Sequence, residues 1–307
     1  MDLCILLSVT SLVLAIVIAV RQHEIAKQTL ILTESIESNE KTRSRVDRFF
    51  GKYTTWQIHL PVSYQRRPLP LVAAGDFFAM HVLSALLGDE RATVEFVNTN
   101  PQFVDRQAHQ NSSLFLCSPK VNKGLGAIYP VFEESKYSAD EFHANYKLPC
   151  WFQSDHPRSE DWMCIRALQN DNLAPVIAFA ANQVYDASQE LELGEGPGNL
   201  SDQNDHAILA RVSQQNRDRG NEARLDIVMA GVHQFGTWIV AHYVDQLVRG
   251  ITKAENPYLL DTDYEFVAVV DGVFAADQLH VIRSGLRPNY FWYRRLGEQA
   301  WCHLPDS

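Results

Sequence analysis

Short apolar runs and longer amphipathic stretches alternate along most of the chain, which is the pattern of strands alternating with helices. The apolar runs show no strict alternation of inward and outward positions, so both faces of the resulting sheet should be covered. Seven runs predict strands: residues 69–75, 92–99, 113–119, 173–180, 206–214, 226–231 and 264–274. We therefore expect an α/β fold built on a Rossmann-like, doubly wound and mostly parallel sheet.

Two of the predicted strands lead directly into a helix pattern. After the first strand, Asp76 is placed to cap a helix and Gly88 to end it. After the strand that ends at Gly231, a short loop precedes Thr237, a second N-cap candidate, and Gly250 follows the last helical residue. Each unit therefore puts a turn at the carboxyl end of a strand.

The longest apolar run lies at the amino terminus, where residues 3–20 contain no charged residue. Such a helix would extend roughly 27 Å, close to the roughly 30 Å of a bilayer core. Arg21 and Lys27 follow the run whereas Asp2 precedes it, which places the remaining chain in the cytoplasm. We expect residues 1–20 to be the transmembrane signal anchor of a single-pass inner-membrane protein. A cleaved signal peptide, the alternative, would carry a basic region before the run.

Residues 21–50 are polar and compatible with a helix, and we expect a helical stalk that continues from the membrane. Apolar residues recur at seven-residue spacing only in part, so a weakly oligomerising coiled coil is the alternative. Three prolines within residues 59–70 then end any helix. We expect a Rossmann-like cytosolic ligand-binding domain over residues 51–307.

The charge balance and the cysteines limit the function. The net charge is −10 and the pI is near 5.5, so no basic surface stands ready to replace the counterions of DNA, and we expect no nucleic-acid partner. The five cysteines are scattered and form no CxxC pair, which argues against a disulfide framework and a zinc site. The histidines do not share metal-ligand spacing within one element. We expect no metal, and no cofactor apart from a nucleotide as ligand.

Three loops at predicted strand ends form the candidate ligand site, because ligands of open α/β sheets bind outside the carboxyl ends of the strands. The unpaired N–H groups at a helix N-terminus favour an anion such as phosphate, and glycines allow its close approach. A hydroxyl, a cation and an amide in one loop suit a phosphate or a ribose. The candidate residues are Gly75, Asp76 and Phe77; Ser118, Lys120 and Asn122; and Gly231, His233, Gln234, Gly236 and Thr237. The alternative is that the glycines serve strand–helix packing and Asp76 serves capping alone.

Catalytic signatures are sparse. The chain has no H-E-x-x-H, no G-x-S-x-G, no P-loop and no G-x-G-x-x-G fingerprint. Asp271, in the sequence VVDGVF, lies at a predicted strand end near the proposed crevice and is the carboxylate most suited to acid–base catalysis. Its alternative role is that of a turn residue before Gly272. Acids of the loop 190–195 are further candidates.

The loops AAGDFF, CSPKVN and AGVHQFGTW, together with one amino-terminal membrane helix and a stalk, resemble the membrane-tethered nucleotide-sensor proteins of bacterial anti-phage systems, whose sensor domains are of the SLOG or TIR-like kind. The resemblance implies a membrane-anchored cytosolic sensor or effector that binds a nucleotide or nucleotide-derived signal. One helix cannot enclose a pore, so an effector would act as a homo-oligomer. A tethered nucleotide or N-glycosidic-bond hydrolase and a non-catalytic membrane scaffold are the alternatives.

Overall fold

The chain folds around a large sheet in its carboxyl-terminal unit. The computed structural model describes residues 37–52, 54–62, 72–98, 112–117, 131–133, 148–154, 163–169, 174–180, 183–186, 203–214, 224–252, 256–275 and 279–304. The chain divides into two compact units, residues 1–45 and residues 46–307. A helix covers residues 37–50, and its last turn contributes Val46, Phe49 and Phe50 to the core of the second unit.

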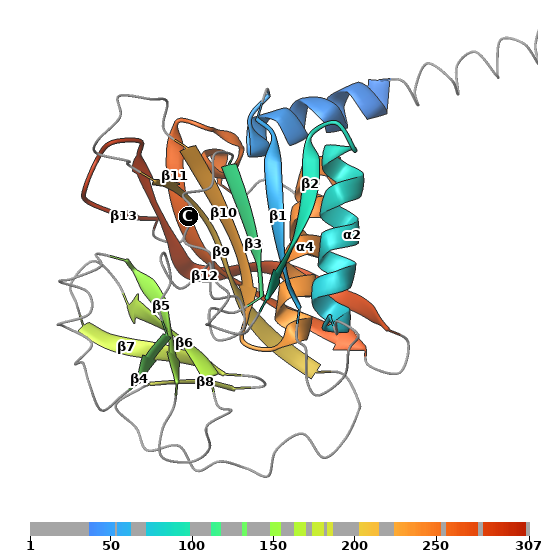
Figure 1. The fold of residues 1–307 in the computed structure, drawn as a ribbon. Coiled ribbons are helices and arrows are strands. Elements are labelled where there is room, and N and C mark those ends of the chain that lie inside the picture. The colour runs from blue at the N-terminus through green and yellow to red at the C-terminus, as the bar shows by residue number, and fades with distance from the viewer. Residues whose placement is uncertain are drawn as a thin grey trace, which may run out of the picture. The chain divides into compact units, whose positions relative to one another are not determined.

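Eight strands form the large sheet, in the order β13-β12-β11-β9-β10-β3-β1-β2 (Figure 1). Their bounds are β1 Trp56–Val62, β2 Ala92–Asn98, β3 Ser112–Leu116, β9 Gln203–Gln214, β10 Arg224–Gly231, β11 Tyr264–Ala275, β12 His280–Arg295 and β13 Cys302–His303. The strands β10, β3, β1 and β2 run parallel to one another, whereas every pairing from β10 through β9, β11 and β12 to β13 is antiparallel. The sheet is therefore mixed.

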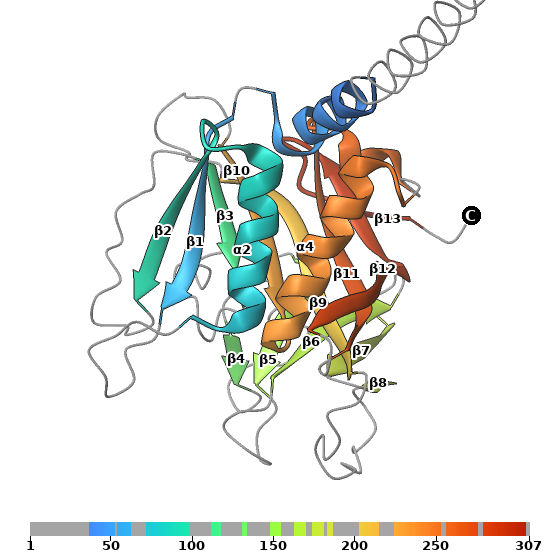
Figure 2. The ribbon, with the colours of Figure 1, turned by 90° about the vertical axis from the view of Figure 1, so that its right-hand side faces the viewer.

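The helices cover one face of this sheet. Helix α2 (Ala74–Leu87) and helix α4 (Gln234–Arg249) lie side by side on it (Figure 2), and the ring of Phe78 stacks on that of Trp238 at 4.3 Å between centroids. A short 3-10 helix, η3 (Pro257–Leu260), precedes β11. Apolar side chains of both helices and of the strands share one core cluster on this face.

A second sheet lies against the opposite face. It has the order β4-β5-β6-β7-β8. The bounds are β4 Val131–Glu133, β5 Cys150–Ser154, β6 Met163–Gln169, β7 Ala174–Ala180 and β8 Gln183–Asp186. Phe152, Ile165 and Phe179 of this sheet share a second core cluster with residues of β9, β10 and β11.

The prediction of a doubly wound, mostly parallel Rossmann-like sheet is therefore wrong. Among the described residues, helices cover one face and a sheet covers the other, and four of the seven strand pairings in the large sheet are antiparallel. The apolar runs of β9 and β11 misled the prediction because both faces of these strands are buried. An antiparallel strand buried on both faces has the same continuous apolar pattern as a parallel one.

The strand before α2 also differs from the prediction. The run at 69–75 was expected to be a strand, but α2 already begins at Ala74, and the preceding strand is β1. Pro61 hid β1 from the sequence pattern, since proline is rare inside a sheet. The pairing of β1 with β3 ends at His59, so Pro61 lies beyond the stretch in which β1 has partners on both sides.

The predicted membrane anchor requires a correction too. Across the described ranges, no helix is both long and apolar enough to cross a bilayer. Helices α2 and α4 have 14 and 16 residues, short of the about 20 that a span requires. The predicted run at 1–20, and the stalk as far as residue 36, lie outside the described residues. The structure therefore gives no support to a single-pass inner-membrane protein, and we do not retain the signal anchor or that location.

One buried cation joins several parts of the core. The Arg211 side chain, in β9, is fully buried, and its guanidinium lies 4.8 Å above the ring of Phe266. It donates hydrogen bonds to five main-chain carbonyls, those of Phe49, Tyr258, Leu259, Asp261 and Tyr264. Burial lowers the pKa of Arg211 to about 10, so the group stays charged at neutral pH. It connects the helix at 37–50 with η3 and β11.

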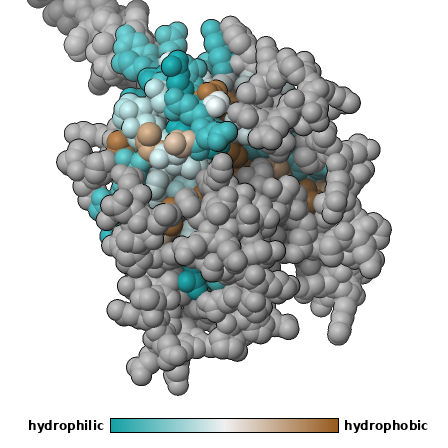
Figure 3. All heavy atoms as spheres, turned by 90° about the vertical axis from the view of Figure 1, so that its left-hand side faces the viewer, coloured by the Kyte–Doolittle hydropathy of each residue, from teal (hydrophilic) through white to brown (hydrophobic). Residues whose placement is uncertain are grey.

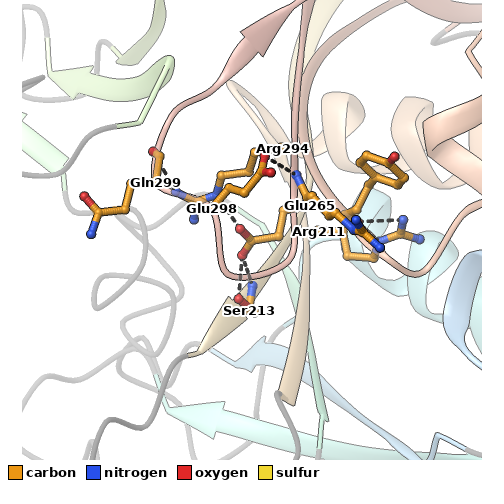
Figure 4. Close-up of polar contacts among 8 residues, drawn as sticks. Arg211, Ser213, Glu265, Arg294, Glu298 and Gln299 are labelled. Carbon is orange, nitrogen blue, oxygen red and sulfur yellow. Dashed lines mark hydrogen bonds and ion pairs between the residues drawn. The ribbon is translucent and has the colours of Figure 1, made fainter.

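A buried carboxylate lies close to Arg211 and is equally well paired (Figure 4). Glu265 accepts hydrogen bonds from the backbone N–H and the hydroxyl of Ser213, and forms an ion pair with Arg294. The guanidinium of Arg294 lies 4.3 Å above the ring of Trp301.

The described surface seen in Figure 3, from the side where β13 lies, is mostly hydrophilic or neutral with small separate apolar spots.

Candidate functional site

The parallel part of the large sheet brings three chain segments to one edge. Strands β1, β3 and β10 are parallel neighbours, so their carboxyl ends lie on the same side of the sheet. The chain places β2 on one side of β1 and β3 on the other, which makes the junction of β1 and β3 a topological switch point. Ligands of open α/β sheets bind at such points. We call this edge, with Asp76, Cys117, Asp205, His233 and Thr237, the carboxyl edge.

Asp76 is the most unusual side chain of the carboxyl edge. It lies in the first turn of α2, whose N-cap is Ala73, and its side chain is buried. Neither carboxylate oxygen has a hydrogen-bond partner among the described residues. Burial raises the pKa of Asp76 to about 6. Weak hydrogen bonding from the Cys117 thiol and the Thr237 hydroxyl lowers the pKa, but neither group meets the geometry of a full hydrogen bond to the carboxylate. Segments following β1, β3 and β10 therefore meet around one unpaired carboxyl group.

Cys117 approaches Asp76 from the end of β3. It follows Leu116, the residue that pairs with Met229 of β10, and it is buried. Its φ is 70°, in the left-handed region that residues with a Cβ rarely adopt. Such a conformation costs on the order of 1–3 kcal/mol and is concentrated at binding and catalytic sites. The backbone strain thus coincides with the unpaired carboxyl group.

Gly231 and Gly236 serve close backbone packing at the start of α4. A Cβ on Gly231 would lie 2.5 Å from the backbone nitrogen of Thr237 and even closer to the carbonyl oxygen of His233. A Cβ on Gly236 would lie 2.7 Å from the carbonyl oxygen of His206. The helix begins at Gln234, earlier than the N-cap position expected for Thr237, and the Thr237 hydroxyl accepts a hydrogen bond from the Gly231 N–H at 3.3 Å.

The N-terminus of α4 is occupied by a carboxylate of the protein itself. Asp205, buried at the start of β9, accepts a hydrogen bond from the Gly236 N–H at 2.7 Å and another from the His206 N–H at 2.8 Å. We expected this helix end to bind an anionic group of a ligand, but the Asp205 carboxylate already lies there. A ligand phosphate at the same position would meet a second negative charge.

His233 lies against Asp205 on the solvent side. Its Nδ1 is 3.7 Å from the nearer Asp205 oxygen, and its side chain is 55% exposed while that of Asp205 is 3% exposed. The carboxylate of Asp205 raises the pKa of His233 above 6.5. The pair therefore consists of an accessible imidazole and a buried carboxylate fixed by two backbone N–H groups.

Asp271 lies on the opposite face of the sheet. Its register partner is His206, while the next pair is Gly272 with Asp205. A Cβ on Gly272 would touch Ile239 of α4, so Gly272 faces the helices and Asp271 faces the second sheet. The Asp271 carboxylate forms a 3.1 Å ion pair with Arg287. Arg287 therefore pairs with the carboxylate, Asp271, that the sequence analysis favoured for acid–base catalysis.

His206 and two aromatic rings surround this second group. The His206 side chain is buried, its Nδ1 has no partner among the described residues, and burial lowers its pKa. Phe179 of β7 lies 5.5 Å from the His206 ring and 4.9 Å from that of Tyr290, between centroids. These side chains are separated from Asp76 by the sheet itself.

The remaining predicted residues have varied outcomes. Gly75 is buried in the first turn of α2, and Phe77 beside it is 49% exposed. Ser118, Lys120 and Asn122 lie outside the described residues. Gln234 is the first residue of α4, and only its backbone is described. No group of three or more His, Cys, Asp or Glu residues in the described ranges is arranged to hold a metal ion.

Sequence reasoning missed Cys117, Asp205 and Arg287. The first directly precedes the predicted residue Ser118, so its place at a strand end was visible, but its backbone conformation was not. Asp205 lies in β9 and Arg287 in β12, which are the antiparallel neighbours of β10 and β11. The predicted parallel order contained neither pairing.

Comparison with protein-family models, curated proteins and solved structures finds no match to this chain, so its function must be inferred from the carboxyl edge.

Proposed function

We propose that the carboxyl edge binds a nucleoside or nucleotide-derived ligand, and that the protein acts as a sensor of this ligand. One observation carries the proposal: among the described residues, no group meets the geometry of a hydrogen bond to the buried Asp76 carboxyl group, although chain segments that follow three strands meet around it. A buried polar group without a partner is unfavourable by about 1–3 kcal/mol, and more when charged. A ligand that donates hydrogen bonds would remove this penalty.

The chemistry of Asp76 selects the kind of ligand. An ionised carboxylate only accepts hydrogen bonds, so the matching groups are hydroxyls, amines or amides. A ribose offers two neighbouring hydroxyls, and carboxylates hold this diol in dinucleotide-binding folds. Asp205 of β9, whose carboxylate lies against the start of α4, makes the same edge unfavourable for phosphate. We therefore place the sugar of the ligand at Asp76 and any phosphate away from Asp205.

Binding would stabilise the arrangement of the three segments. A ligand present at about 100 times its dissociation constant adds roughly 2.7 kcal/mol to the free energy of unfolding. Because α2 and α4 both contribute side chains around Asp76, the ligand would fix the two helices relative to each other. This change in order would be the output of the sensor.

A thermal-shift panel on the full chain tests the proposal. The probes are adenosine, guanosine and their 5′-monophosphates, each with its 2′-deoxy counterpart. We expect at least one ribonucleoside probe to raise the melting temperature, its deoxy counterpart to have less effect, and Asp76→Asn to abolish the difference. Asp263→Asn, at an exposed position, is the matched control and should respond like the wild type. If no probe raises the melting temperature, the proposed ligand class is wrong.

A further inference from the structure

The imidazole of His233 has no structural task that Asp205 does not already perform. Asp205 alone accepts the N–H of Gly236 and so occupies the first turn of α4. The His233 side chain makes no capping hydrogen bond to the helix, although His233 is its N-cap residue. The contact between His233 and Asp205 directs Nδ1 of the imidazole toward the Asp205 carboxylate, while the His233 side chain stays 55% exposed.

Both oxygens of Asp205 are fixed, which determines how the ring is held. One accepts from the His206 N–H and the other from the Gly236 N–H, so the carboxylate cannot rotate without losing a hydrogen bond. A buried carboxylate against Nδ1 keeps a proton on that nitrogen and leaves Nε2 as the base. Asp205 is the charged side chain that the structure places against His233, while Asp271 and Arg287 lie on the other face of the sheet.

We propose that His233 is a general acid–base residue, that Asp205 positions it, and that the pair hydrolyses the N-glycosidic bond of a nucleoside or nucleotide held at the carboxyl edge. This inference rests on the proposed function, since it requires the sugar to lie at Asp76. It goes beyond that function because a sensor needs no chemistry.

The charges of the carboxyl edge favour this bond over a phosphate ester. A glycosidic bond breaks through a transition state in which the sugar carbon becomes positively charged. The carboxylates of Asp76 and Asp205 would stabilise this charge, whereas they would repel a phosphate that gains negative charge. The charged side chains by which the carboxyl edge is defined are the carboxylates of Asp76 and Asp205 and the imidazole of His233.

In the proposed step, the oxygen of a water molecule forms a bond to the anomeric carbon. The bond from that carbon to the base nitrogen breaks, and the base leaves with the electron pair. Nε2 of His233 takes a proton from the water and then passes it to the leaving base. The products are the free base and the sugar with a new hydroxyl, so that no oxidant, metal or further reactant is needed.

The test measures release of free base by chromatography, with the full chain and four probes: adenosine, guanosine, AMP and GMP. We expect the wild type to release base from at least one probe. His233→Gln should lower kcat by about 10²- to 10⁴-fold, the usual contribution of general acid–base catalysis, without changing the dissociation constant. His81→Gln, on the exposed side of α2, is the control and should keep the wild-type rate.

The role of Asp205 is tested through the pH profile. Since the carboxylate raises the pKa of His233, Asp205→Asn should move the acid limb of the rate profile to lower pH. A purely structural role would lower the rate without moving this limb. Binding without release of base, or an unchanged rate in His233→Gln, overturns the inference and leaves the proposed function standing. If the probes neither bind nor react, both are wrong.

Discussion

Arg211 and Asp76 are two buried charged side chains with opposite surroundings. Arg211 donates to five main-chain carbonyls and lies on the ring of Phe266, so its charge is compensated inside the protein. Asp76 is equally buried, but its oxygens have no partner among the described residues, and its pKa is raised to about 6. The first arrangement stabilises the fold, whereas the second destabilises it. This difference is the basis for the proposal that Asp76 serves ligand binding.

The largest effect is expected at the compensated charge. Replacing Arg211 by Met would leave five buried carbonyls without their donor, and we expect unfolding to require about 3–5 kcal/mol less. Urea unfolding followed by circular dichroism measures this loss. Arg249→Met, which removes an exposed ion pair with Asp245, should change stability by less than about 1 kcal/mol. Equal effects of the two substitutions would show that the Arg211 contacts do not stabilise the fold.

The glycines near Asp76 offer the next test, since they too could serve binding or packing. A Cβ on Gly231 meets backbone atoms that cannot move aside easily, so Gly231→Ala should destabilise the protein by about 1–3 kcal/mol. Gly285→Ala is the matched control, because its Cβ would meet nothing within 4 Å. If Gly231→Ala were as stable as the wild type but lost ligand, the glycine would serve the ligand alone.

Asp76→Asn should have the opposite sign. The pKa of Asp76 rises from 3.8 to about 6 on folding, so the group favours the folded state only while it is protonated. This contribution, at most roughly 3 kcal/mol, is complete below pH 3.8 and is lost as the pH rises through about 6. The neutral amide avoids the loss, although its N–H groups fit the site imperfectly. We expect Asp76→Asn to be more stable by about 1–2 kcal/mol at pH 8, and equally stable near pH 4, in urea unfolding.

A variant that was less stable than the wild type at pH 8 would contradict this reading. It would show that Asp76 acts as a first-turn carboxylate that stabilises α2 through the helix dipole. The raised pKa would then have no bearing on a ligand.

The smallest effect on stability is expected at His233. Its ion pair with Asp205 is stabilising below pH 6.5 and disappears as the pH rises through the raised pKa of the imidazole. Because the side chain is 55% exposed, we expect His233→Gln to lower stability at pH 6 by only a few tenths of a kcal/mol, and not at all at pH 9. A loss above about 1 kcal/mol at both pH values, in the same unfolding assay, would show a structural role instead.

Local signals in the sequence located most elements of the large sheet. The predicted strands at 92–99, 226–231 and 264–274 lie within two residues of β2, β10 and β11. Gly88 and Gly250 follow the last residues of α2 and α4, as their capping pattern predicts. What the sequence did not contain was the direction of each strand. Side-chain burial depends on the two faces of a strand, not on the direction of its neighbours.

The candidate site divides in the same way. Asp76 and Thr237 were named from the sequence because each follows a strand and opens a helix, and the structure does bring them together. The partners that change their chemistry come from distant segments. Asp205 precedes Gly236 by 31 residues and reaches it only because β9 is antiparallel to β10. Contacts of this kind follow from the topology, which the apolar pattern left open.

One measurement tests the central claim most directly: urea unfolding of the wild type and of Asp76→Asn at pH 8, with and without the purine ribonucleoside probe that gives the largest thermal shift. Without the probe, the variant should be more stable. With the probe at about 100 times its wild-type dissociation constant, the wild type should gain roughly 2.7 kcal/mol and the variant much less, so that the order reverses. If the probe stabilised both proteins equally, Asp76 would not be part of the binding site.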